Sequence, residues 1–230
     1  MSIRTHRRTG STRRFRRVVV AAALASATVT TVALPTGAVQ AAPAAVTVDR
    51  GRARQADVIA DQAAAALNVV ERFLETGDAD LLDSFDEQRD AIAAAVAERL
   101  GLDPAAMQRA WRTADLDHQT ALIAGLGQLG VSYRRNTSKP GVSFDCSGFT
   151  TYAWSRAGVT LARQSSAQIK AAAPRDPSTA QAGDLVQYPG HVMMWLGVDR
   201  AVVHAIQPGK PVSVDIVSGR KSLRFGDPTV

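Results

Sequence analysis

The sequence predicts an α+β fold, with helices in the first part of the chain and strands in the last part. Apolar residues recur at helical spacing between about residues 55 and 129, whereas alternating and β-branched runs appear only after residue 183. Helices and strands do not alternate, as they would around a parallel sheet. We therefore expect an α+β unit preceded by an all-helical segment.

The first 41 residues are expected to be a secretory signal peptide. Seven arginines precede an apolar run from Val18 to Leu34, and Val39 and Ala41 have the spacing of a cleavage site. A membrane anchor is the less favoured alternative, because a spanning helix needs about 20 strongly apolar residues. Paired arginines in the basic cluster fit a twin-arginine exporter and a general exporter equally. The mature chain is thus predicted to be secreted, without a stable membrane anchor.

Removal of this segment changes the charge of the protein. Residues 1–41 hold 7 of the 27 basic side chains and none of the 21 acidic ones, so the whole-chain charge of +6 does not indicate nucleic-acid binding. Residues 42–117 carry 8 basic and 15 acidic side chains, and residues 118–230 carry 12 and 6. This asymmetry could serve docking of one half on the other, or attraction to an anionic polymer. The simpler interpretation is that both halves have ordinary, solvated charged surfaces.

Residues 42–117 are predicted to form a helical N-terminal segment. Helical spacing covers residues 55–77 and 83–100, and an Asp-Pro pair opens a shorter helix over residues 103–111. No catalytic constellation occurs in this segment. A spacer, an interaction module for a cell-wall or division protein, and a pro-segment that covers the active site are the roles considered for it.

Residues 118–230 are predicted to combine helices with strands. Helices are expected at residues 118–129, 144–157 and 164–173, with a loop at 131–143. Strands are expected at residues 184–188, 191–196, 201–206 and 212–217.

The single cysteine, Cys146, lies between Asp145 and Ser147 at the start of a predicted helix. One cysteine cannot form an internal disulfide, and a free thiol outside the cell is open to oxidation. Backbone N–H groups at a helix start favour a thiolate, as a nucleophile requires. The alternative is a small buried side chain packed between Phe144 and Phe149.

Two histidines could serve such a thiolate. A two-residue turn at Gly197-Val198 would place His191 directly opposite His204, with Cβ atoms about 4.5–5.5 Å apart on one face of a hairpin. A register slip of one residue would put the rings on opposite faces. If the helix that carries Cys146 covers that face, the thiol gains a base and the base gains an orienting group. His118 is expected to be exposed or to cap a helix.

A zinc site is the competing interpretation of the same residues. Cysteine and histidine both bind zinc, but the chain offers one cysteine and lacks paired short spacings such as C-x-x-C. No metal and no other cofactor are therefore expected.

Several segments taken together resemble the NlpC family of papain-like cell-wall cysteine peptidases. They span about Thr120 to Val217 and read "LGQLGVSY", "FDCSGFTTYAW", "GVTLARQSSAQ", "AGDLVQYPGHVMMWLG" and "VVHA". The resemblance implies a papain-like domain over residues 118–230, in which the cysteine helix packs on an antiparallel sheet. It also implies hydrolysis of the γ-D-glutamyl-meso-diaminopimelate bond in peptidoglycan stem peptides.

The resemblance further implies roles for individual residues. Cys146 is the nucleophile, His191 the general base and acid, and His204 the group that orients the imidazole. All three positions of this Cys-His-His triad are occupied here, which favours an active enzyme.

The substrate side of the site is implied in the same way. Tyr133 matches a tyrosine that helps to hold the oxyanion, and Asp145 and Ser147 match positions that contact the stem peptide. Arg163 matches a site-bordering arginine, although a solvated residue at a helix start is an equal alternative. Most members read Trp-Gly-Gly after the tyrosine, where this chain has Arg134-Arg135-Asn136, so the cleft wall is expected to differ.

Two other functions stay open at this point. One is a non-catalytic protein that binds or scaffolds the cell wall, and the other is a thiol amidase or acyl transferase on the same scaffold. Peptidoglycan stem peptides are the expected partner, and nucleic acid is not expected.

Overall fold

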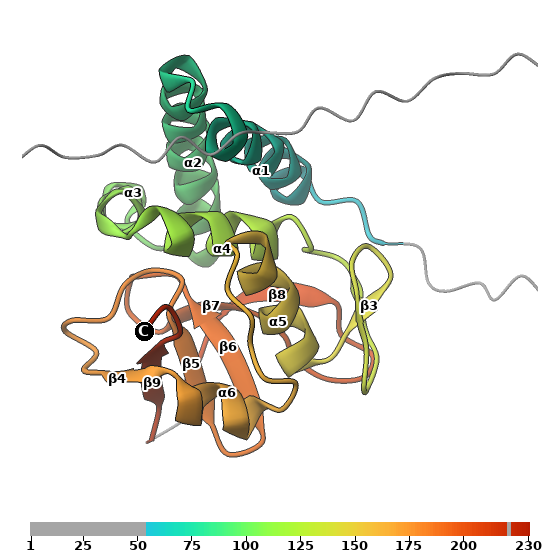
Figure 1. The fold of residues 1–230 in the computed structure, drawn as a ribbon. Coiled ribbons are helices and arrows are strands. Elements are labelled where there is room, and N and C mark those ends of the chain that lie inside the picture. Colours follow the sequence, from blue (N-terminus) through green and yellow to red (C-terminus); the bar gives the residue numbers. More distant parts are fainter. Residues whose placement is uncertain (1–53, 220–221) are drawn as a thin grey trace, which may run out of the picture. The chain divides into compact units, whose positions relative to one another are not determined.

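The structure is a computed structural model that describes residues 54–219 and 222–230, all of which belong to one compact unit (Figure 1). The predicted signal peptide, residues 1–41, lies outside the described residues. The helices are α1 (Val58–Thr76), α2 (Ala79–Leu100), α3 (Pro104–Thr113), α4 (Leu116–Leu126), α5 (Cys146–Arg156) and α6 (Ser165–Ala171). In this part of the chain no helix is long and apolar enough to cross a membrane.

The three helices predicted for the N-terminal segment are present, and their ends follow local signals. Asp57 caps α1 by accepting hydrogen bonds from two backbone N–H groups, and Gly77 ends it with a φ of 71°. α3 begins at Pro104 after the cap Asp103, as the Asp-Pro pair predicts. α2 begins four residues before the predicted start, because Asp78 caps it.

A six-stranded antiparallel sheet carries the second half of the fold, in the order β4-β9-β5-β6-β7-β8. The four predicted strands are confirmed within two residues at each end. Strands β4 and β9 were not predicted, because a proline and a glycine interrupt their short patterns. The bounds are β4 (Ala173–Arg175), β5 (Leu185–Tyr188), β6 (His191–Trp195), β7 (Ala201–Ala205), β8 (Val212–Ile216) and β9 (Arg224–Asp227).

Helices α4 and α5 pack together over one face of this sheet, α1 and α2 lie on the far side of α4, and α3 lies beside the start of α4 (Figure 1). One continuous core joins all these layers, from Val70 of α1 through Phe149 of α5 to Met194 of β6. Trp111 of α3 is fully buried in it and donates a hydrogen bond of 2.8 Å to the carbonyl of Leu196. The N-terminal helices are thus fastened to the sheet by shared packing.

Residues 131–143, expected to be a loop, contain short strands instead. A second sheet has the order β1-β3-β2, with β1 (Ser132–Tyr133), β2 (Ser138–Lys139) and β3 (Ser143–Phe144). Two-residue strands carry no periodic pattern, which is why the sequence does not reveal them. β1 also forms a bridge to Pro211, just before β8, so this small sheet borders the large one.

The β6–β7 turn corrects the predicted register. Met194 pairs with Val203 and Trp195 pairs with Val202, so His191 does not lie directly opposite His204. The connection, residues 196–200, is five residues long and uses positive φ at Gly197 (83°) and Asp199 (48°). The pairing therefore differs by two residues from the predicted one, and a shift of two leaves every side chain on its expected face.

Helix α5 covers the other face of the sheet from the one that was expected. Met194 of β6 packs against Phe149 in the main core, whereas Met193 and Trp195, which alternate with it, belong to a separate cluster with Val202. By strand alternation the histidines share the face of that second cluster. The cysteine helix consequently does not lie over the histidine face, and only its first residues can approach the histidines around the end of the strands.

Candidate active site

Cys146 is the first residue of α5, two residues later than the predicted helix start. Phe144 belongs to β3 and Asp145 is the N-cap, whose carboxylate accepts a hydrogen bond of 2.7 Å from Gly148 N–H. The thiol is free, partly exposed, and packs against the edge of the core. It therefore has the position at a helix start that suits a thiolate.

Backbone contacts bring the Cys146 region to the end of the sheet where the histidines lie. Tyr133 pairs with Phe144 in the small sheet, and its N–H donates to the carbonyl of Lys210, just before β8. β8 in turn pairs with the strand of His204. Burial raises the pKa of Tyr133, and the nearby charges of Cys146 and Asp145 raise it further. The predicted oxyanion tyrosine thus lies close to the thiol.

His191 and His204 contact each other directly. His191 Nε2 lies 3.0 Å from His204 Nδ1, and both rings are buried. The ring of Tyr188 packs against His191 with centroids 5.2 Å apart. The prediction that the two rings meet on one face is confirmed, although they meet diagonally across the ladder.

Asp215 is a site residue that the sequence reasoning missed. Its Oδ2 lies 3.0 Å from His204 Nε2 and accepts a 2.7 Å hydrogen bond from Ser213. The hydrogen bond with His204 lowers the pKa of Asp215 against the opposing effect of burial, so the side chain is a carboxylate at neutral pH. The β7–β8 register pairs His204 with Ser213, and the Ser-x-Asp alternation on β8 was the available signal.

The carboxylate determines which nitrogen of each neutral ring carries a proton. Asp215 can only accept, so His204 Nε2 is the protonated nitrogen and His204 Nδ1 is an acceptor. His191 Nε2 must then donate to His204 Nδ1, which leaves Nδ1 of His191 as its basic nitrogen. The chain Asp215–His204–His191 therefore fixes both the orientation and the tautomer of His191.

Asp145, Ser147 and Arg163 form one network beside Cys146. Arg163 contacts both oxygens of the Asp145 carboxylate, at 2.9 and 2.7 Å, and donates to the Ser147 hydroxyl at 2.9 Å. Burial alone would raise the pKa of Asp145, but the hydrogen bonds from Arg163 and Gly148 outweigh it and lower the pKa. A polar hollow of about 440 Å³ is lined by Asp145, Ser147, Arg163 and Asn136 among others.

Gln168 of α6 is a second residue that the sequence reasoning missed. It is 1% exposed, and its amide N–H groups donate to the carbonyls of Ser147 and Ala162. Its carbonyl accepts a 2.7 Å hydrogen bond from Thr150. Gln168 thereby fastens the segment that carries Arg163 to the first turns of α5.

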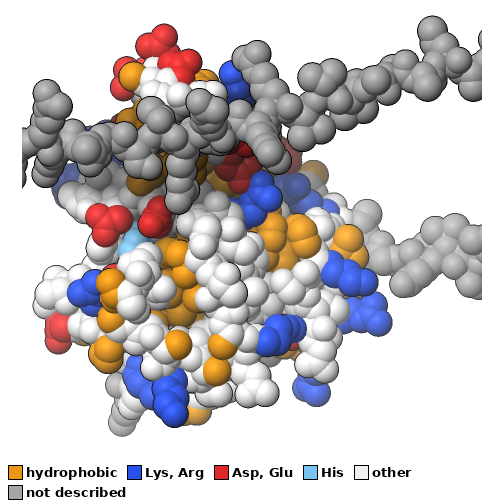
Figure 2. Space-filling view, in the orientation of Figure 1, with side chains coloured by type: hydrophobic (Ala, Val, Ile, Leu, Met, Phe, Trp, Pro, Cys, Tyr) orange, Lys and Arg blue, Asp and Glu red, His pale blue; other side chains and the backbone are white. Residues whose placement is uncertain are grey.

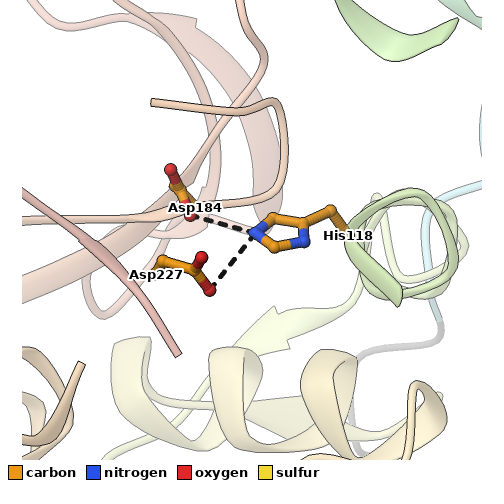
Figure 3. Close-up of side chains that lie close together, drawn as sticks. All are labelled: His118, Asp184 and Asp227. Atoms are coloured by element: carbon orange, nitrogen blue, oxygen red, sulfur yellow. Dashed lines mark hydrogen bonds and ion pairs between the residues drawn. The ribbon is translucent and has the colours of Figure 1, made fainter. Parts of the chain in front are cut away.

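His118 is fully buried, which contradicts its predicted exposure. Figure 3 shows one nitrogen of its ring facing both Asp184, just before β5, and Asp227, at the end of β9. The distances from His118 Nε2 are 3.1 Å and 3.5 Å, and the ring packs edge-on against Trp154. The polar residues around His118 in the sequence suggested solvent, but the helix turns this side chain into the core.

The three ligand-type side chains of this cluster lie within 4.8 Å of one another, close enough to hold a metal ion. However, each carboxylate oxygen already has a donor. Asp184 accepts from His118 and from the Gln181 N–H, while Asp227 accepts from Arg175 and Thr229. With an arginine cation also present, these side chains fit a buried hydrogen-bonded network that joins α4 to β5 and β9 better than they fit a metal site.

The described residues thus form an α+β unit with a cysteine at a helix start and a buried histidine pair on an antiparallel sheet. Residues 130–223 match the model of the NlpC/P60 family.

Among curated relatives, a probable endopeptidase of Corynebacterium glutamicum is 34% identical over 113 residues, which are 46% of this chain and 53% of that protein. The chain thus spans about half the length of that relative. NlpC2 from Trichomonas vaginalis is a similar solved structure, with 22% identity, a TM-score of 0.45, and coverage of 51% of this chain and 50% of the other. RipD from Mycobacterium tuberculosis, described as a non-catalytic NlpC/p60 domain protein adapted to peptidoglycan binding, is 25% identical, with a TM-score of 0.41, and covers 49% of this chain and 98% of its own.

Proposed function

We propose that the protein is a secreted peptidoglycan endopeptidase that hydrolyses the γ-D-glutamyl-meso-diaminopimelate bond of stem peptides. The observation that carries this proposal is the hydrogen-bonded chain from Asp215 through His204 to His191, in the same domain as the partly exposed thiol of Cys146. General-base chemistry needs an imidazole that is held in one tautomer, and here Asp215 acts on His191 through His204. Core packing alone would not require such a chain.

The proposed reaction has two steps. The Cys146 thiolate attacks the amide carbonyl carbon, and a proton on His191 Nδ1 passes to the leaving amine as the carbon–nitrogen bond breaks. Water then attacks the resulting thioester while His191 accepts its proton, and the thiolate leaves to restore the enzyme. His204 holds the ring of His191 in place during both steps, and no cofactor takes part in this scheme.

Substrate contacts are proposed for the residues around the polar hollow. Tyr133 is proposed to donate toward the developing oxyanion, which is supported by its pairing with Phe144, two residues before the thiol. Asp145 and Ser147 are proposed to contact the stem peptide, with Arg163 holding the Asp145 carboxylate in position. This network supports a positioning role for Arg163 over the alternative of a solvated residue at a helix start.

Residues 42–117 and 118–230 are proposed as two regions with different tasks, a helical support and a peptidase domain. The buried Trp111 and the shared core support a helical layer that stabilises the sheet. They favour a fixed support, on which a cell-wall or division protein could bind, over a removable pro-segment.

Two alternatives remain from different classes. A non-catalytic wall-binding protein would use the same hollow without chemistry, and a thiol amidase or acyl transferase would form the same thioester but act on another bond or acceptor. The intact relay from Asp215 to His191 counts against the first of these.

Mass spectrometry of muropeptide fragments separates these functions. Incubation of the mature chain with a defined stem peptide should release a fragment with a free γ-glutamyl carboxyl group and a fragment with a free diaminopimelyl amine. Binding without cleavage would support the wall-binding alternative, and a different new end group would support another thiol enzyme. Either result would contradict the proposal.

A further inference from the structure

Four basic side chains gather at the turns that border Tyr133. Arg134 and Arg135 lie on the β1–β2 connection, Lys139 is the last residue of β2, and Lys210 lies on the β7–β8 connection; all four are exposed. The two connections are held together by the hydrogen bond from Tyr133 N–H to the Lys210 carbonyl, at 3.3 Å. Figure 2 shows Lys and Arg side chains on the surface over β3.

None of these four cations pairs with a carboxylate of the described residues. By contrast, the following arginines do so: Arg54, Arg89, Arg99, Arg109, Arg112, Arg156, Arg163 and Arg175. Asp145, a nearby acidic residue, is already neutralised by Arg163. The four charges therefore remain available to an anionic group that enters from solvent.

Arg135 and Lys210 are the two that flank the candidate site. Arg135 is close enough to Tyr133 to oppose the rise in its pKa, and Lys210 contributes to the lowered pKa of Asp215. Asn136, the next residue after Arg135, lines the polar hollow with Asp145. One cation thus stands on the tyrosine side of the site and the other on the histidine side.

We propose that Arg135 and Lys210 make the enzyme selective for stem peptides that carry free carboxylates over the same peptides with amidated carboxyls. This inference rests on the proposed function, because it assigns the charge of the substrate at that site. A glutamyl residue linked through its γ-carboxyl keeps an α-carboxyl, and diaminopimelate keeps carboxyls of its own. Amidation removes the negative charge of such a group while hardly changing its size, so charge alone distinguishes the two substrates.

The test compares kcat/KM of the mature chain for three stem peptides: the free acid, the glutamyl α-amide and the diaminopimelyl amide. Since one exposed ion pair is worth up to about fivefold, the wild type should prefer the free acid by about three- to fivefold over at least one amide. The amide with the lower kcat/KM identifies the carboxylate that Arg135 and Lys210 contact. The preference should shrink as salt is raised from about 0.05 to 0.5 M, because exposed charges are screened.

The variants are the double substitution Arg135→Gln with Lys210→Gln and the matched control Arg72→Gln. Arg72 is an exposed arginine of α1 with no carboxylate partner among the described residues, far in the fold from β1. The double variant should bring the acid-to-amide ratio below about 2, and the control should keep the wild-type ratio. A ratio of rates for two substrates is insensitive to partial loss of folded protein.

Each remaining outcome has a definite meaning. Equal wild-type rates on acid and amides would overturn the selectivity while leaving the proposed hydrolysis intact. A wild-type preference that the double variant retains would overturn the assignment to Arg135 and Lys210. Failure to cleave any of the three peptides would instead overturn the proposed function itself.

Discussion

In the proposed mechanism Asp215 acts on Cys146 only through the rings of His204 and His191. Replacing it by asparagine keeps the shape but allows the side chain to donate as well as accept, so His204 is no longer held with its proton on Nε2. We expect Asp215→Asn to lower kcat by about 100-fold or more with little change in KM, and to shift the pH profile of kcat.

Ser213→Ala is the control for that substitution. Ser213 donates to the same Asp215 oxygen but contacts neither ring by hydrogen bond, so kcat should fall by much less. Steady-state kinetics on a defined stem peptide between about pH 5 and 9 measures both variants. A wild-type pH profile for Asp215→Asn would contradict the tautomer argument.

At the scale of residues, the sequence allowed part of the site to be predicted. The proximity of His191 and His204 followed from strand alternation, which survives a register error of two. Asp215 and Gln168 could not be predicted, because their roles depend on the β7–β8 register and on the packing of α6 on α5. The predicted exposure of His118 was wrong, because the buried face of a helix cannot be assigned before the elements that pack against the helix are known.

At the scale of elements, the β6–β7 turn is the most constrained connection near the site. Gly197 has a φ of 83°, and a Cβ there would lie 2.7 Å from Ala110 Cβ and 2.9 Å from Ala182 Cβ. Gly197→Ala should therefore suffer both backbone strain, of roughly 1–2 kcal/mol, and overpacking, of roughly 1–3 kcal/mol.

Gly77→Ala is the matched control for the turn. Its φ is 71°, but nothing lies within 4 Å of the added Cβ, so only the strain remains. Urea unfolding of both variants measures the difference in free energy of unfolding. Equal losses for the two would show that α3 does not restrict the turn.

Elements with a long periodic pattern were predicted well and short ones were not. The helices from α1 to α5 and the strands from β5 to β8 bury one regular stripe or alternate face, and this is what periodicity reports. The strands of the small sheet have two residues each, so only their partners define them. The side of the sheet that α5 covers was also beyond prediction, because alternation identifies two faces without saying which one a helix takes.

At the scale of the whole molecule, stability should depend on several carboxylates that are ionised in the fold. Burial opposes ionisation of Asp227, but hydrogen bonds from Thr229 and Arg175 outweigh it and lower its pKa; Asp145 and Asp215 are lowered by comparable contacts. Below about pH 4 the unfolded chain binds protons more readily than the folded protein, so acid favours unfolding.

We therefore expect the melting temperature to fall steadily as the pH is lowered from about 5 to 3, while these three groups contribute no pH dependence above about 6. Asp227→Asn should melt lower than the wild type at neutral pH and show a smaller further loss in acid, since one of the protonation sites is gone. Differential scanning calorimetry across this range checks both statements. An equal acid loss in the variant would contradict the role given to Asp227.

The composition predicted the acidic first half and the basic second half of the chain. It did not predict what these charges do in the fold. Figure 2 shows acidic side chains on the helices at one end and basic side chains over the β1–β3 sheet. The structure connects the two halves through a common core. The positions of Arg135 and Lys210 beside the candidate site could not be predicted, because the β1–β2 and β7–β8 connections are far apart in the sequence.

The most direct test of the account is the turnover of a defined stem peptide by Cys146→Ala next to Ser155→Ala, a substitution on the exposed side of the same helix. With circular dichroism confirming that both variants are folded, Cys146→Ala should lose at least about 1,000-fold in kcat/KM and Ser155→Ala should match the wild type. Turnover by folded Cys146→Ala within tenfold of the wild type would contradict thiol catalysis at the start of α5.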